Sequence, residues 1–144
     1  MVSRAAYRQF SKITTRWFDN DIYGHMNNAL HYQLFDTAVN GYLIKTGVLD
    51  LHSGKTVFLV VETGCQYFSE LAFPDVITAG FCVTKLGRSS VRYEVSLFRN
   101  DADIAAAKGH FVHVNVDRET RRPVLIGQSA RNILSELVVE GTAS

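Results

Sequence analysis

The fold is decided by residues 16–43, which read RWFDNDIYGHMNNALHYQLFDTAVNGYL. The first half of this stretch is a polar turn rich in Asp and Asn. In the second half, apolar residues recur at steps of three and four, the spacing of one face of an α-helix. The members of this face are Leu30, Leu34, Phe35, Ala38, Val39, Tyr42 and Leu43. We therefore expect a buried helix over residues 28–45 that follows an acidic loop directly.

The start of this helix combines negative charge with free hydrogen-bond donors. Asn27 or Asn28 stands where a cap belongs, and its side chain could accept a hydrogen bond from an orphan backbone N–H. The first N–H groups of a helix lack intrahelical partners and attract anions. A carboxylate from the preceding loop would thus lie beside donors that polarise a bound group. Gly47 is the expected stop signal after the helix.

Composition limits the class of protein. The 144 residues are 47% hydrophobic, which suits one domain, residues 1–144, with a buried core. Fifteen Lys and Arg against 14 Asp and Glu give a net charge of +1, so we expect no nucleic-acid partner. No apolar run reaches the roughly 20 residues of a membrane span. Because MVSRAAYRQF lacks the apolar stretch of a secretory signal, we expect a cytoplasmic protein.

After the helix, β-rich runs alternate with short polar turns. The clearest run is VRYEVSL at 91–97, where apolar and polar residues alternate with a period of two. Further strands are expected over residues 7–18, 56–68, 75–87 and 104–116. Ser129 is a candidate cap for a short terminal helix. Short connections favour antiparallel pairing, and one sheet must bury one face, so we expect an α+β fold whose sheet is covered by the long helix.

Several reactive side chains fit structural roles. Cys65 and Cys82 lie in expected strands without metal-ligand spacing, which predicts reduced, buried thiols. His110 and His113 are an odd number of residues apart, so they point to opposite faces of a strand and cannot act as a pair. His31, at the helix start, is expected to be packed or hydrogen-bonded.

The acids of the turn are stronger functional candidates. Asp19 and Asp21 have the spacing of a calcium-binding loop, but Tyr23 and Leu30 would then occupy ligand positions 5 and 12, which excludes that match. Asp19 is expected to close the turn, a routine role for Asp.

Two further side chains each have two interpretations. His25 either serves as a base or fills a structural, pocket-lining role. Glu62 lies in an expected strand, where an unpaired buried carboxylate would be costly. It therefore either lines a pocket or takes an edge or paired position.

The stretch RWFDNDIYGHMNNALHYQLFDTA resembles acyl-CoA thioesterases of the 4-hydroxybenzoyl-CoA thioesterase type, in the hotdog-fold superfamily. The shared feature is an Arg and Asp-x-Asp, then Gly-His-x-Asn-Asn leading into a helix. The runs VVETGCQYFSELAFPD, GRSSVRYEVSLF and VNVDRETRRPV are similar to later strands and turns of the family. Most of residues 10–125 is covered.

The resemblance implies a hotdog fold, in which a curled antiparallel sheet wraps around the central helix. It also implies a homodimer with active sites at the interface, and we further expect a homotetramer of two dimers. Asp21 matches the family's catalytic carboxylate, and backbone N–H groups around residues 26–28 match its oxyanion donors. The oxyanion site and pocket would comprise Gly24, His25, Met26, Asn27, Asn28 and Glu62. No metal or bound cofactor is expected.

A CoA substrate carries phosphates, so cations should surround the pocket mouth. The turn Arg88, Ser89 and Ser90 is the candidate CoA-binding segment, and Arg118, Arg121 and Arg122 form a second basic loop. Exposed, solvated charge is the other interpretation of both loops.

The expected activity is hydrolysis of an acyl-CoA thioester to a free acid and CoA. Asp21 would attack the carbonyl or activate a water, and the residues do not choose between these routes. Two alternatives stay open. One is a hotdog dehydratase or hydratase on acyl thioesters, which would need His25 and an acid for proton transfer at carbon. The other is a non-catalytic acyl-CoA-binding protein.

Overall fold

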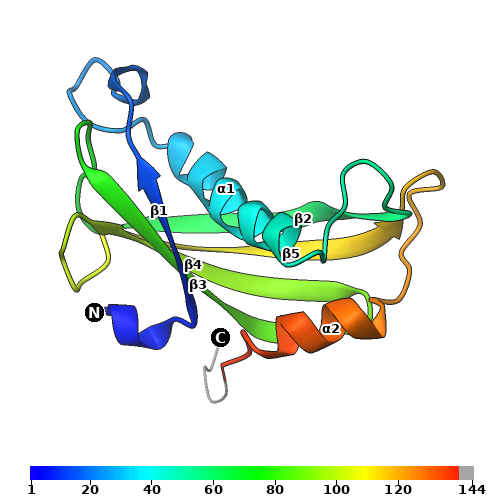
Figure 1. The fold of residues 1–144 in the computed structure, drawn as a ribbon. Helices are drawn as coiled ribbons and strands as arrows, with labels where there is room; N and C mark the ends of the chain where they lie inside the picture. The colour runs from blue at the N-terminus through cyan, green and yellow to red at the C-terminus, as the bar shows by residue number, and fades with distance from the viewer. Residues whose placement is uncertain (140–144) are drawn as a thin grey trace.

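A five-stranded antiparallel sheet curls around one long helix in the computed structural model, which describes residues 1–139 (Figure 1). The strands are β1 (Gln9–Thr14), β2 (Thr56–Tyr67), β3 (Val76–Leu86), β4 (Ser90–Arg99) and β5 (Ala107–Asp117). The helices are α1 (Leu30–Lys45) and α2 (Gln128–Ser135), with short 3-10 helices η1 (Arg4–Ala6) and η2 (Trp17–Asp19). The predicted α+β hotdog architecture is confirmed, with element ends shifted by a few residues.

The strand order is β1-β3-β4-β5-β2, and every neighbouring pair is antiparallel as predicted. Although β2 and β3 are consecutive in the chain, β4 and β5 lie between them in the sheet. The segment between β2 and β3 therefore crosses one end of the sheet, beside the loop that leads into α1. Strands β1 and β2 form the two edges.

Helix α1 buries one face against the concave side of the sheet (Figure 1). Phe35, Ala38, Val39 and Leu43 are each at most 2% exposed, whereas other members of the predicted apolar face are only half-buried. A Cβ at position 109 of β5 would collide with the Phe35 ring, so Gly109 allows this helix to approach the sheet.

The ends of the helices differ in part from the prediction. Helix α1 begins at Leu30, two residues later than expected, and no side chain caps it. The side-chain oxygen of Asn27 instead accepts a hydrogen bond from the N–H of Ala29 at 2.9 Å. Gly47 follows α1 with φ +82°, as expected for a stop signal. Ser129 was a wrong choice of cap, because α2 begins one residue earlier, after Gly127.

His113 of β5 is enclosed by aromatic rings on the helix-facing side of the sheet. Its ring stacks on Phe58 at 5.4 Å between centroids and also contacts Tyr93 and Phe111. Its Nδ1 has no hydrogen-bond partner within residues 1–139. Burial lowers the pKa of His113 to about 4, because the charged ring cannot be hydrated there. His110 lies on the opposite face, as predicted.

This burial makes stability depend on pH. The unfolded chain protonates His113 near pH 6.5, but the folded chain resists protonation down to about pH 4. The contribution to stability is therefore complete above pH 6.5 and is lost as pH falls, by on the order of 3 kcal/mol. His113→Phe should reduce the fall in unfolding free energy between pH 6.5 and pH 4 by that amount in urea titrations. The exposed-site variant His52→Phe should keep the native pH dependence; an equal slope in all three proteins would contradict this account.

Candidate active site

The loop between β1 and α1 is held in shape by Asp19. This carboxylate is 6% exposed and accepts hydrogen bonds from the Arg16 backbone N–H and guanidinium, each at 2.8 Å. The carbonyl of Asp19 accepts the N–H of Asn27 at 3.1 Å. Asp19 therefore closes the turn, as predicted, and all of its contacts serve the loop's shape.

Asp21 lies in the tight turn that Asp19 supports. Its Oδ1 accepts the Tyr23 N–H at 2.9 Å, and its Oδ2 lies 3.7 Å from Nδ1 of His25. The backbone closes the turn, because Gly24, with φ +84°, donates its N–H to the Asp21 carbonyl at 3.1 Å. The Asp21 side chain is 20% exposed. One carboxylate oxygen is thus anchored, while Oδ2 accepts no hydrogen bond from any residue in the range 1–139.

The three backbone N–H groups at residues 26–28 differ in whether they already donate a hydrogen bond. Met26 donates its N–H to the carbonyl of Leu71 at 2.7 Å, and Asn27 donates to Asp19. The N–H of Asn28 has no acceptor among the described residues. The expected group of oxyanion donors is therefore reduced to Asn28, next to the positive end of α1.

A pocket of about 230 Å³ opens beside this donor. Its lining residues are His25, Met26, Asn28, His31, Tyr67, Phe68, Ser69, Glu70 and Leu71. His25 connects Asp21 to the pocket, since its ring contacts the Asp21 carboxylate and also forms part of the wall. The structure thus brings Asp21, His25 and residues 26–28 together, as the sequence predicted for this stretch.

His31 is packed and hydrogen-bonded, as predicted. It is 3% exposed, and its Nδ1 lies 3.2 Å from the carbonyl of Asn28. Since a carbonyl can only accept, Nδ1 carries the proton in this contact. Burial lowers the pKa of His31, which favours the neutral ring.

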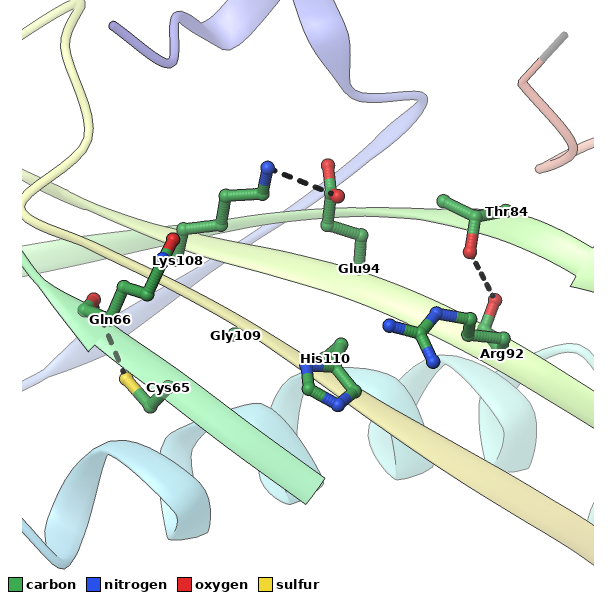
Figure 2. A pocket seen from close by; sticks show the side chains of 8 residues that line it. All are labelled: Cys65, Gln66, Thr84, Arg92, Glu94, Lys108, Gly109 and His110. Atoms are coloured by element: carbon green, nitrogen blue, oxygen red, sulfur yellow. Dashed lines mark hydrogen bonds and ion pairs between the residues drawn. The ribbon is translucent and has the colours of Figure 1, made fainter. Parts of the chain in front are cut away.

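Glu62 does not join this pocket within one chain. It is 56% exposed in the edge strand β2 and pairs with Arg92 at 3.1 Å and His110 at 3.0 Å. These partners line a separate pocket on the sheet face away from α1, where Lys108 pairs with Glu94 (Figure 2). The edge and paired interpretation therefore describes Glu62, and the outer pocket's cations already have carboxylate partners.

The turn of Arg88, Ser89 and Ser90 is also remote from Asp21 in the same chain. Thr14 pairs with Val76, so the loop carrying Asp21 lies at the start of β3. The turn follows the other end of this 11-residue strand, about 36 Å away at 3.3 Å per residue. There, Arg131 of α2 donates to the carbonyls of Gly87 and Arg88.

Neither cysteine is suited to nucleophilic attack. Burial raises the pKa of the Cys65 thiol and raises that of Cys82 to about 12, so both thiols stay protonated.

Within residues 1–139, no three His, Cys, Asp or Glu side chains gather as a metal site. In the same range, no helix combines the length and apolar character needed to cross a bilayer.

Comparison with known proteins defines the class. A sequence profile of the thioesterase-like superfamily matches residues 15–134, and the chain belongs to this superfamily. The PA5185 protein of Pseudomonas aeruginosa is 49% identical, with 96% of each chain covered and a TM-score of 0.93. The CoA complex of SAV2348 from Staphylococcus aureus shares the fold at 20% identity, covering 89% of this chain and 82% of that one (TM-score 0.81). DHNA-CoA thioesterase from the same organism does so at 17% identity, covering 88% and 86% (TM-score 0.77). No curated protein matches significantly. The predicted resemblance to hotdog thioesterases is confirmed.

The sequence did not reveal the contacts of Tyr67. Its hydroxyl donates to the carbonyl of Asn28 at 2.7 Å, across 39 positions of the chain. In the sequence, an aromatic residue at this place in a strand suits the core and a pocket wall equally well. The only sequence feature that could have indicated this hydrogen bond was an aromatic ring with a hydroxyl group at the end of a strand.

Proposed function

We propose that this protein is an acyl-CoA thioesterase that hydrolyses a thioester to a free acid and CoA. The observation that carries the proposal is that the Asp21 carboxylate lies 3.7 Å from the ring of His25, which lines one pocket together with Asn28, whose N–H has no acceptor among residues 1–139. Membership in the thioesterase-like superfamily supports it. So do two proteins of the same fold, a CoA complex and a DHNA-CoA thioesterase.

The carbonyl oxygen of the thioester gains negative charge when it is attacked. The Asn28 N–H would donate a hydrogen bond to this oxygen, and its position at the start of α1 adds the favourable helix dipole. A thiolate is a good leaving group, so no strong general acid is needed.

Asp21 supplies the attack in one of two ways. As a nucleophile, its Oδ2 attacks the carbonyl carbon, the C–S bond breaks, and CoA leaves as thiolate. Water then hydrolyses the anhydride, which releases the acid and restores the carboxylate. As a general base, Asp21 takes a proton from the attacking water, and this proton passes to the departing thiolate. Both routes use the unbonded carboxylate oxygen.

We propose a homodimer as the active form. Trp17, Phe18, Ile22 and Tyr23 beside the site are each at least 78% exposed. The edge strand β2 also exposes apolar side chains over residues 59–61. Exposed apolar surface next to an unpaired strand edge favours association with a second copy.

In such a dimer, the turn at residues 88–90 would serve the active site of the partner subunit. Its distance from Asp21 in one chain excludes a role at the same chain's site, and the Arg88 side chain has no hydrogen-bond or ion-pair partner among residues 1–139. Arg88→Ala should raise KM for acyl-CoA on the order of tenfold, through loss of a charged hydrogen bond to phosphate.

Subunit mixing tests this arrangement. Hybrids of Asp21→Asn and Arg88→Ala subunits would each contain one site with both native residues. Random mixing should therefore raise kcat/KM to about a quarter of the native value, well above the average of the unmixed variants. If mixing leaves activity at that average, Arg88 does not act across the interface. Light scattering of the native protein checks the dimer itself.

A thiol-release screen over a panel of acyl-CoAs tests the activity. We expect continuous release of CoA from at least one member, with the free acid formed in equal amount. Hydration of a crotonyl thioester without thiol release would instead support the dehydratase or hydratase alternative. Binding of acyl-CoAs with no reaction would support a non-catalytic binding protein.

A further inference from the structure

The carbonyl of Asn28 is held by two side chains from different parts of the fold. The Tyr67 hydroxyl donates to this oxygen at 2.7 Å, and Nδ1 of His31 lies 3.2 Å from it. A carbonyl oxygen has two lone pairs, so these donors fill its hydrogen-bonding capacity. The two rings also pack edge to face, with centroids 4.7 Å apart at 85°. Tyr67 and His31 thus form a clamp on one backbone atom.

The residue before Asn28 is held as firmly. The Asn27 carbonyl, which shares a peptide plane with the Asn28 N–H, accepts the N–H of Leu30 at 3.0 Å, and the Asn27 N–H donates to the Asp19 carbonyl at 3.1 Å. Between the peptide planes on either side of the Asn28 Cα, only two backbone torsions are free to rotate. With the planes held on both sides, the direction of the Asn28 N–H is set.

We propose that Tyr67 and His31 are positioning residues, which aim the Asn28 N–H at the thioester oxygen by holding the Asn28 carbonyl. The inference deepens the proposed function and rests on it. The clamp contacts neither Asp21 nor its turn, so its effect reaches the reaction through the backbone of Asn28. A donor helps the transition state only when it is fixed where charge develops.

The Tyr67 hydroxyl is suited to this task. Burial, with Cys65 and Tyr32 nearby, raises the pKa of Tyr67 to about 12, so the phenol remains a donor at neutral pH. The ring ends β2 at the pocket wall. Phenylalanine would keep the ring contact with His31 and remove the hydroxyl that donates to the Asn28 carbonyl.

Tyr67→Phe is therefore the main test, on the acyl-CoA that the native protein hydrolyses best. We expect kcat to fall about three- to tenfold, the range set by one neutral hydrogen bond, with KM unchanged within about twofold. The thermal midpoint should stay close to the native value. Tyr42→Phe is the matched control, because the Tyr42 hydroxyl on α1 has no hydrogen-bond partner within residues 1–139. Its kcat should equal that of the native protein.

NMR gives a readout that does not need turnover. Loss of a hydrogen bond to a carbonyl moves its ¹³C resonance upfield, so Tyr67→Phe should shift the Asn28 carbonyl and the neighbouring Ala29 amide, and Tyr42→Phe should not. If the native protein hydrolyses no acyl-CoA, the proposed function fails, while this shift still supports the clamp. Unmoved Asn28 resonances, an unchanged kcat in an active enzyme, or a rise in KM without a fall in kcat would each overturn the inference.

Discussion

Asp21→Asn is expected to lower kcat on the best acyl-CoA by at least about a hundredfold, in line with the removal of a general base or nucleophile. The amide keeps the size of the side chain, and its oxygen can still accept the Tyr23 N–H that anchors Oδ1. What is lost is the negative charge on Oδ2, the oxygen that accepts no hydrogen bond from residues 1–139. Because the turn keeps its contacts, the loss should appear in the rate and not in folding.

The comparison uses steady-state thiol release with pure proteins. Asp101→Asn removes the same charge from an exposed turn where the side chain makes no hydrogen bond or ion pair with residues 1–139, and it should keep native kcat. Thermal midpoints of all three proteins establish that each is folded. Turnover of Asp21→Asn at the native rate would remove this carboxylate from the mechanism.

Asn28→Pro should lower kcat about 10²- to 10³-fold, the usual loss for one oxyanion donor. Proline removes the backbone N–H and nothing else that donates from this peptide. Position 28 precedes the first residue of α1, where a missing N–H breaks no intrahelical bond. The Asn28 carbonyl remains available to Tyr67 and His31, so the clamp can persist while the donor is absent.

Asn28→Ala separates the backbone from the side chain, since alanine keeps the N–H. The kcat of the Pro variant should lie at least about a hundredfold below that of the Ala variant, with KM values that differ much less. Circular dichroism and thermal midpoints report whether α1 is intact in both. Equal kcat values for the two variants would show that this N–H does not stabilise the oxyanion.

Periodic patterns predicted the architecture well. The three- and four-residue spacing over residues 28–45 identified α1, and the alternation in VRYEVSL identified β4. Short polar turns marked the limits of the other strands. The first strand was predicted too long, because its flanks are aromatic and β-branched while only Gln9–Thr14 pairs with β3. Spacing alone cannot show where pairing stops.

The candidate site also has a part that the sequence predicted and a part that it did not. The carboxylate, the glycine and the asparagines could be named from the chain, because they follow one another in a single turn before the helix. Which of their N–H groups stays unpaired could not be predicted, because the Met26 N–H donates to the carbonyl of Leu71, 45 positions away in the chain. Glu62 and Arg88 were remote from Asp21 for a related reason: the face of a strand and the end of a sheet depend on register and strand order.

Local periodicity thus suffices for the helix, the strands and the acidic turn, because their patterns arise from neighbours in the chain. The donor at Asn28 and the clamp of Tyr67 and His31 depend on contacts between distant segments. Those contacts form only when the sheet curls around α1, and the folded backbone then selects which polar groups are satisfied and which remain open for chemistry.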